Sequence, residues 1–574
     1  YALKWLPDLH FNLNLGYDVS KSKENLYTAA NSPTAWDGWR NDGAGTHQYI
    51  EQFKSNTLLD FYMNYQKQVD CIKSFFDVTA GYSWQRFYSD GHNNGTVFTT
   101  DGFSTPVLNE DGTYTLNWGT ERKGTTYTDP AKTAWAKHLQ LLSFFGRFNY
   151  TLMDRYLFTF TVRGDASSRF SKENRWGVFP AAALAWKITD EAWMKNVKNV
   201  MNEMKLRLGW GVTGQQDIGD SYYPYLATYV ASVQGSNYPS LSGNGFISTM
   251  YPTGYDPKLK WEETTTWNAG FDFAFLNNRI TASIDYYLRK SKDLLSYVSV
   301  PSGSSTTNMM NQNIGTLKNE GIEFSITARP IVTNDFTWTA SYNVAYNKNR
   351  ITKLNNDGSY IETGAISSGN GNNCQVQAVG HSVNSFFLFE QVYDKNGKPL
   401  EGVYVDQNGD GVINDDDRRI RHSKDPKVTM SFSSTFNWKN WDLGFALHAN
   451  IGNYVYADAM SDHSVVDDCW KNGKVNNLIK ADNYFNGTIN PAVGIMKSDY
   501  WLRNASFLRC DNITLGHTWP KLLDNKMRLR LYGAVQNPFV ITKYKGLDPE
   551  VADGIDRDLY PRATTFTLGV VASF

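Results

Sequence analysis

Residues 267–289 read WNAGFDFAFLNNRITASIDYYLR, and this stretch decides the fold. Apolar side chains alternate with small or polar ones on both sides of Asn277-Asn278, whose short side chains tolerate the positive φ of a tight turn. A period of two places the apolar side chains on one face and the polar ones on the other. The stretch therefore predicts a β-hairpin, either in a soluble sandwich or in a membrane barrel with lipid outside and water inside.

The composition favours the barrel over the sandwich. The 574 residues include 34 Tyr, 32 Phe and 18 Trp, yet the mean hydropathy is only -0.48. Such a combination is typical of strands that expose every second side chain to lipid between two aromatic girdles. No apolar run approaches the roughly 20 residues of a membrane-spanning helix. The net charge of -1 gives no field that would attract nucleic acid.

The same alternation recurs along the chain and predicts about sixteen strands, an even number within the range of outer-membrane barrels. Long loops separate them at one end, and the largest spans residues 355–425. At the other end we expect a link at 189–203, with a short helix at 190–202, and tight turns at 70–74, 153–155, 277–278, 330–335, 439–440 and 520–525. Barrels separate short periplasmic turns from long extracellular loops, whereas sandwiches mix them. We therefore predict an all-β, transmembrane antiparallel barrel.

Several stretches, in order and spacing, resemble one family. They are GRFNY (146–150), RGDASSRF (163–170), WGVFP (176–180), GVTGQQDIG (211–219), LRNASFLR (502–509), NITLG (512–516), QNPF (536–539) and YKGLDPE (544–550). With them the chain resembles the SusC/RagA family of TonB-dependent outer-membrane transporters.

This resemblance implies a 22-stranded barrel with an N-terminal plug, energised through TonB-ExbB-ExbD. It also implies a SusD-like surface lipoprotein that helps to capture oligosaccharides or peptides, and a dimer of such SusC–SusD pairs. Residues 1–574 would be the barrel portion, without the TonB box, the plug and roughly six strands. Because lipid forbids unpaired sheet edges, we expect those strands to come from a segment outside this chain.

A candidate calcium loop lies in the 355–425 segment. Residues 406–417 read DQNGDGVINDDD, with Asp406, Asn408 and Asp410 at positions one, three and five, and with the Val412 carbonyl at position seven. Position twelve is Asp417 instead of the longer Glu, so a weaker, structural Ca²⁺ site is expected. The alternative is a solvated cluster of Asx and Gly turns.

Other candidates are aromatic. Side chains in or beside external loops could stack on sugars or pack against a lid protein, although packing within the loops or in the interface belt is the simpler explanation for any one of them. They are Tyr222, Tyr223, Tyr225, Phe387 and Trp470. Inward-facing charges could line a substrate path, although pairing with the plug or with water is the simpler interpretation. They are Asp272, Asp285, Arg289, Glu323 and Arg329. Phe574 ends an alternating strand and resembles the C-terminal signal read by barrel-assembly machinery; it could equally be a lipid-facing aromatic.

Signatures of enzymes are missing from the sequence. It contains no HExxH, GxSxG, P-loop or strand-associated GxGxxG. We therefore predict the barrel of an outer-membrane importer of oligosaccharides or peptides and no enzyme. A passive porin-like channel and a secreted carbohydrate-binding β protein are the alternatives.

Overall fold

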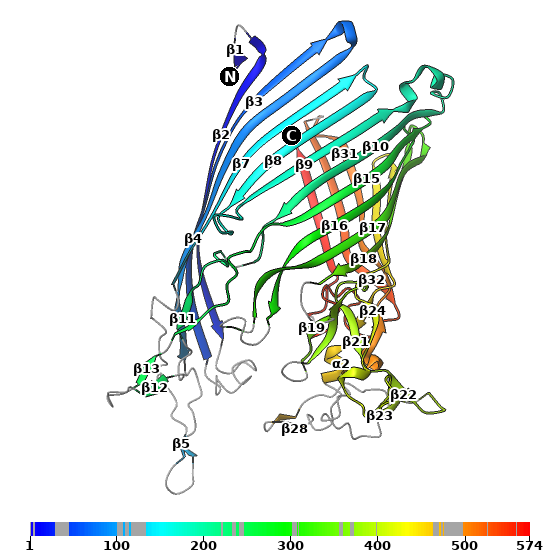
Figure 1. Cartoon of the computed structure of the whole chain (residues 1–574). Coiled ribbons are helices and arrows are strands. Elements are labelled where there is room, and N and C mark those ends of the chain that lie inside the picture. The colour runs from blue at the N-terminus through cyan, green and yellow to red at the C-terminus, as the bar shows by residue number, and fades with distance from the viewer. Residues whose placement is uncertain are drawn as a thin grey trace.

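A computed structural model of the chain shows one large curved sheet with loops gathered at one end (Figure 1). It describes residues 2–3, 6–28, 45–99, 107–108, 114–115, 134–219, 222–231, 237–239, 246–248, 250–300, 307, 309–354, 360–367, 372–397, 399–462, 470–471, 474–475, 497–524, 526–557 and 560–574. No helix in this part of the chain is long and apolar enough to cross a membrane.

Consecutive strands of the large sheet are neighbours in space, and all their pairings are antiparallel. The strands are β1 (Ala2–Leu3), β2 (Leu6–Thr28), β3 (Gly45–Val69), β4 (Ser74–Thr99), β7 (Ala134–Leu152), β8 (Tyr156–Ser167), β9 (Trp176–Lys187), β10 (Met201–Gln215), β15 (Glu262–Phe275), β16 (Ile280–Ser299), β17 (Met309–Val332), β18 (Phe336–Lys353), β25 (Val428–Trp438), β26 (Trp441–Ile451), β31 (Phe507–Leu522), β32 (Met527–Thr542) and β33 (Thr565–Ser573). The sequence indicates about sixteen strands; the sheet contains 17, of which β1 has only two residues.

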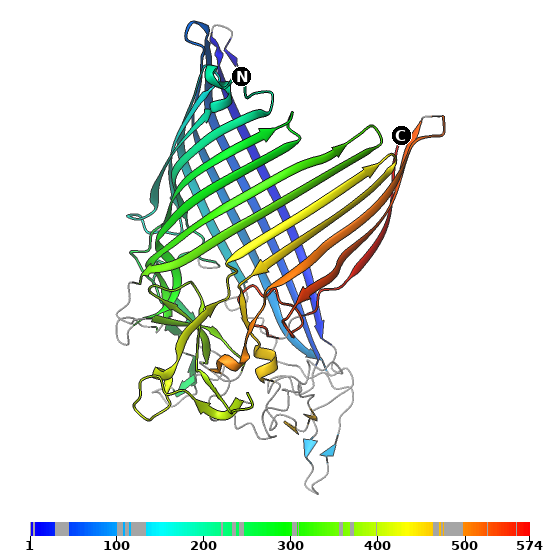
Figure 2. The same ribbon diagram turned by 90° about the vertical axis from the view of Figure 1, so that its right-hand side faces the viewer.

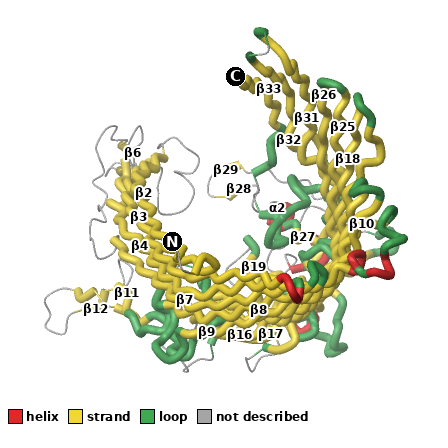
Figure 3. The backbone as a smooth tube through the Cα atoms, turned by 90° about the horizontal axis from the view of Figure 1, so that it is seen from above, coloured by secondary structure: helices red, strands yellow, loops and turns green. Residues whose placement is uncertain are grey.

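The wall is strongly curved, and it stays open between its first and last strands (Figure 3). Within the described residues β33 pairs only with β32, and β2 pairs with β1 and β3. Phe566 and Leu568 on β33 are 78% and 79% exposed. The described wall is therefore barrel-like in curvature, with two free edges.

Short and long connections separate as the sequence predicts. β15 and β16 are joined by residues 276–279, and Asn277 and Asn278 adopt φ of 57° and 60°. All the predicted tight turns join strands at one end of the wall, where the N- and C-terminal ends of the chain also lie (Figures 1 and 2). The loops lie at the other end.

The predicted helix at 190–202 is wrong. The link between β9 and β10 contains two 3-10 turns, Ile188–Asp190 and Ala192–Met194, followed by further turns up to residue 200. Several of its hydrogen bonds join residues three apart, such as Val197 N to Met194 O at 3.0 Å. Valine and asparagine are poor helix formers, so propensity does not favour an α-helix in such a short link.

Alternation gives the wall an apolar outer face and a polar inner face. Phe271, Ile284, Phe324 and Val344 face each other across four strands in one outer row. The adjacent inner row contains Asp272, Ser283, Ser325, Asn343 and Ser431. Trp267 and Ile284 on the outer face are 40% and 43% exposed, as expected of side chains that meet lipid instead of a protein core.

The long loops fold into small sheets at the loop end. They are β19 (Tyr360–Ala365), β20 (Asn373–Ala378), β21 (Ser385–Leu388) and β24 (Arg419–Ser423) in one sheet; the pairs β22 (Gln391–Tyr393) with β23 (Pro399–Tyr404) and β27 (Tyr454–Tyr456) with β30 (Leu502–Asn504); and the helix α2 (Asp458–Asp462). Further short strands are β5 (Val107–Leu108), β6 (Tyr114–Thr115), β11 (Tyr229–Ala231), β12 (Asn237–Pro239), β13 (Phe246–Ser248), β14 (Met250–Pro252), β28 (Trp470–Lys471) and β29 (Lys474–Val475).

A compact hydrophobic core holds the loop unit formed by β19–β24, β27, α2 and β30. Phe386, Leu388, Tyr456, Trp501 and Ile555 are at most 2% exposed and pack together. Seen along the axis of the wall, α2 and β27 lie inside its curve (Figure 3). The loop unit therefore sits over the mouth of the wall with a packed core of its own, and backbone bonds such as Ile351 N to His381 O at 2.9 Å tie it to β18.

Two adjacent positions test the assignment of the faces. Ile284→Lys places a charge near the middle of the lipid-facing band and is expected to cost about 2–4 kcal/mol of folding free energy. Ser283→Lys, one residue away on the inner face, is expected to cost well below that. Equilibrium folding into lipid vesicles measures both, and equal losses would contradict the assignment.

Candidate functional site

One arginine joins two of the inward acids that the sequence predicts, Asp272 and Asp285. Arg207 on β10 donates from Nε and Nη2 to Asp272 on β15 at 2.8 and 2.7 Å. It donates from Nη1 and Nη2 to Asp285 on β16 at 2.9 and 3.0 Å. Gly270 makes room for this cluster, because a Cβ there would lie 2.2 Å from Asp285 Oδ1. The sequence of β10 does not predict that Arg207 pairs with these acids, because the pairing depends on the register of three strands.

A second cluster of charges fastens the segment after β32 to the inner wall. Arg509 on β31 donates to Asp548 at 2.6 Å, and the two residues are 3% and 5% exposed. Arg562 extends the cluster with contacts of 2.9 Å to Asp548 and 3.0 Å to Glu550. Asn537 accepts a further bond from Arg509 at 2.8 Å. Two arginines therefore neutralise two acids, and of these four residues Arg509 and Asp548 are the buried pair while Arg562 and Glu550 remain partly exposed.

Removal of one member of the buried pair should be costly. Arg509→Met leaves Asp548 buried beside only one arginine and is expected to lower the free energy of unfolding by about 3–5 kcal/mol. The double variant Arg509→Met/Asp548→Leu should recover part of that loss, because it removes the uncompensated charge. Thermal unfolding in detergent compares the two, and a double variant less stable than the single one would contradict the expected coupling.

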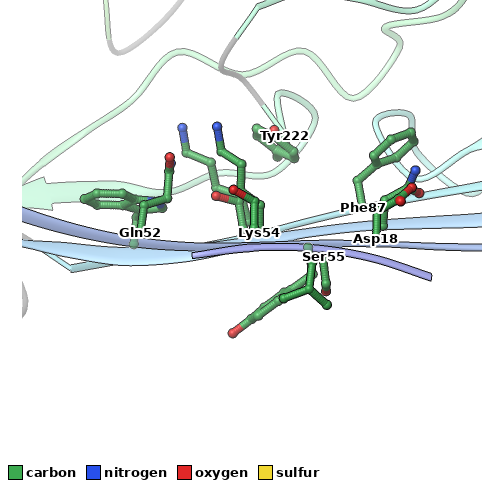
Figure 4. Close-up of a pocket in the computed structure, with 13 residues that line it drawn as sticks. Asp18, Gln52, Lys54, Ser55, Phe87 and Tyr222 are labelled. Atoms are coloured by element: carbon green, nitrogen blue, oxygen red, sulfur yellow. The ribbon is translucent and has the colours of Figure 1, made fainter. Parts of the chain in front are cut away.

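A pocket of about 670 Å³ lies on the inner face near the loop end, where β2, β3, β4 and β7 meet the segment after β10. Asp18, Gln52, Lys54 and Phe87 project from the wall on the side of Tyr222, whereas Ser55 lies on the opposite side (Figure 4). In register, Asp18 neighbours Asn56 and Asn56 neighbours Phe87, while Lys54 neighbours Ser89. The pocket thus combines rings, amides and charges.

Tyr222 forms the side of this mouth pocket opposite the strands. Its ring lies 5.4 Å from Lys137 Nζ and 5.2 Å from Arg169 Cζ. Arg169 is held in turn by Asp217 at 2.9 Å and by the Gly219 carbonyl at 3.1 Å. Cations on aromatic faces fix ring orientation, so Tyr222 is a preorganised platform.

The other predicted aromatics occupy different places. Tyr223 donates its hydroxyl to the His138 carbonyl at 3.3 Å and ties the segment to β7; Tyr225 is half-buried and does not line the pocket. Phe387 is only 8% exposed and packs against the Arg418 guanidinium at 4.3 Å, so it offers little surface to a substrate. Trp470 lies in β28, and its side chain is outside the described residues.

Phe574 follows the last strand and is 95% exposed. It ends the edge strand of the wall, so its role as an assembly signal stays a prediction.

The predicted calcium loop is closed by its own hydrogen bonds. Asp406 accepts from the backbone N–H groups of Gly409 and Gly411 at 2.7 and 2.8 Å, and Asp410 accepts from that of Val412 at 2.8 Å. Buried Asp417 accepts from Asn414 N and Gln407 N, and these bonds hold the pKa of its carboxyl below the usual value. Asn408 donates to Asp410 at 3.0 Å. In the described part of the chain no group of three or more acidic, His or Cys side chains is arranged so that it could hold a metal ion, so Ca²⁺ binding stays a prediction.

Calcium titration tests that prediction. Ca²⁺ added to chelator-treated protein is expected to raise the unfolding temperature of the loop unit, because a ligand of the folded state stabilises it. Asp410→Asn should abolish the rise, whereas Asp394→Asn, in a neighbouring loop, should keep it. An unchanged unfolding temperature in the parent protein would contradict calcium binding.

A family model described as "TonB dependent receptor-like, beta-barrel" matches residues 2–537. The chain belongs to this family of TonB-dependent receptors. The receptor is therefore an outer-membrane protein whose strands cross the membrane many times, and the SusC/RagA resemblance of its sequence is confirmed.

Several curated relatives match the whole chain, and two of them illustrate the match. The receptor is 43% identical to TonB-dependent receptor SusC of Bacteroides thetaiotaomicron, over 100% of this chain and 55% of that protein. It is 30% identical to TonB-dependent receptor P3 of Formosa agariphila, over 100% of this chain and 57% of that protein. The chain thus spans a little over half the length of these relatives.

A solved structure shares the fold. The structure of the RagAB peptide transporter superposes with a TM-score of 0.78, at 22% identity, over 99% of this chain and 60% of the matched chain. At that identity the likeness shows the fold alone.

Proposed function

We propose that this chain forms the substrate-conducting wall of a TonB-dependent importer of oligosaccharides. The observation that carries the proposal is the mouth pocket, which lies on the inner face at the loop end, where an external solute would enter. Tyr222 and Trp135 supply rings, and Asp18, Gln52 and Asn56 supply hydrogen-bonding groups. Aromatic faces stack on the apolar faces of sugar rings, while amides and carboxylates bind hydroxyl groups.

The inner wall supports passage of a polar solute. Its face carries serines, asparagines and the Arg207 cluster, so a hydrated substrate meets groups that replace water. The 43% identity to SusC over the whole chain supports the same function class. The proposal contains no catalytic step, and the relatives are named as receptors and a peptide transporter.

The similarity to SusC and to the RagAB transporter supports a proposal about partners. We propose that a SusD-like lipoprotein covers the loop end, that TonB-ExbB-ExbD drives import through an N-terminal region of the complete protein, and that two such pairs form a dimer. The solved structure that shares the fold is named as the RagAB peptide transporter. The second candidate substrate is therefore a peptide, and a passive channel is the alternative mechanism.

Uptake by cells tests the substrate. Tyr222→Ala is expected to raise the concentration for half-maximal uptake of labelled oligosaccharides about fivefold, because a stacked ring contributes about 1 kcal/mol. Tyr222→Phe keeps the ring and should keep most of the uptake. Tyr229→Ala, an exposed tyrosine of the same segment, is the matched control.

The outcomes separate the candidates. Uptake of peptides but not of oligosaccharides would contradict the proposed substrate class and identify peptides as the substrates. Equal uptake with and without TonB would show passive diffusion and contradict active import. An oligosaccharide uptake that Tyr222→Ala leaves unchanged would contradict the role of the mouth pocket.

A further inference from the structure

Four cations gather on the outer face of the wall at its loop end. We call them the cationic rim: Lys290 on β16, Lys318 on β17, and Lys348 and Arg350 on β18. Lys290 neighbours Lys318 in register, and Lys318 neighbours Arg350, so three of them form one row across three strands. Lys348 lies two residues before Arg350 on the same face of β18, and it pairs in register with Glu320.

The rim begins where the apolar band of the outer face ends. On β16 the outward residues of the band run from Ile280 to Leu288, and Lys290 is the next outward position. At about 3.3 Å per residue and a strand tilt of about 40°, this band is about 20 Å tall, close to the thickness of the lipid-facing band of such barrels. Lys290 Nζ lies 5.6 Å from the ring centroid of Trp267, an outward aromatic at the same border. The rim therefore lies at the level of lipid headgroups, on the extracellular side.

Few acids neutralise the rim. Lys318 pairs with Glu320 at 2.8 Å, and the neighbouring Lys292 pairs with Glu263 at 2.8 Å. Among the described residues Lys290, Lys348 and Arg350 form no salt bridge, and all three side chains are exposed. Glu320 also interacts electrostatically with Lys348 and Arg350, so three cations share one acid and the rim keeps a net positive charge for an external anion.

A cavity continues the rim towards the loop unit. Its volume is about 390 Å³, and Lys348 and Arg350 line it together with Arg421, His422 and Lys427. Asp425, which also lines it, is already paired with Lys424 at 2.9 Å. Burial lowers the pKa of His422, and the positive charges of Lys427 and Arg421 lower it further. Arg421 is paired with Glu390, so Lys348, Arg350 and Lys427 are the lining cations that extend the positive surface into the cavity.

We propose that the cationic rim binds the phosphate groups of lipid headgroups in the outer leaflet. The rim is continuous with the lipid-facing band, and its side chains point away from the lumen, so the surrounding lipid is the partner that meets it first. Lysine and arginine at this depth keep their aliphatic stems in the apolar layer and their charged ends among the headgroups. Several phosphates held in one row would fix the depth of the receptor in the membrane.

Lipid retention by the complete protein tests the proposal. The protein, purified in a non-ionic detergent, is titrated with monophosphoryl lipid A and with the same lipid after phosphatase treatment, and bound lipid is counted by native mass spectrometry. The test variant carries four glutamines in place of the rim cations: Lys290→Gln, Lys318→Gln, Lys348→Gln and Arg350→Gln. The matched control removes four cations at or near the turns of the opposite end: Lys195→Gln, Lys439→Gln, Lys521→Gln and Lys526→Gln.

We expect the phosphorylated lipid to bind the parent protein and the control alike. Binding to the rim variant should be roughly 100-fold weaker, because each cation near an anionic headgroup contributes a several-fold factor. Excess inorganic phosphate should not displace the lipid, since acyl chains add contacts that free phosphate lacks. A heat-modifiable shift in electrophoretic mobility confirms that each variant is folded.

Three outcomes would overturn the proposal. They are equal retention of the phosphorylated and dephosphorylated lipid, unchanged retention by the folded rim variant, and loss of a protein partner from the rim variant while its lipid binding persists. The last outcome would assign the rim to a protein. Substrate uptake plays no part in this readout, so the proposed import function can fail without affecting it.

Discussion

The long strands of the wall cross hydrocarbon, where their backbone N–H and C=O groups find no water and must bond to neighbouring strands. The antiparallel ladder satisfies that constraint along β2 to β33 and leaves it unmet only at the two free edges of the described wall. The chain order, the uninterrupted pairing and the short turns at one end all follow from it. Once the strands are paired, alternation directs every second side chain outward.

The inner face is subject to the opposite demand. Charges on this face must be paired or hydrated, and Arg207 pairs with Asp272 and Asp285 at the same time. Farther towards the loop end, Arg509 and Arg562 neutralise Asp548 and so hold the last long segment against the wall. These clusters shape a polar interior whose walls carry their own counter-charges.

Function gathers at the loop end because the regular strand pattern ceases there. The wall supplies a fixed platform, and the segment after β10 folds back over it to form the mouth pocket with Tyr222. The loop unit packs its own core over the opening and is free of the alternation that governs the strands. At the same level the outer face changes from apolar to cationic between two successive outward positions of β16, Leu288 and Lys290.

The sequence by itself determined the alternating faces, the tight turns and the membrane location, because strand period and turn chemistry are local properties. It also placed Asp272 and Asp285 on the inner face and Tyr222 in an external segment. Only the tertiary structure decided that Arg207 bridges those two acids, that Tyr222 meets β2, β3, β4 and β7 across a pocket, and that Phe387 is buried beside Arg418. Those contacts join segments far apart in the chain, and they depend on register, curvature and loop packing, which a local pattern does not encode.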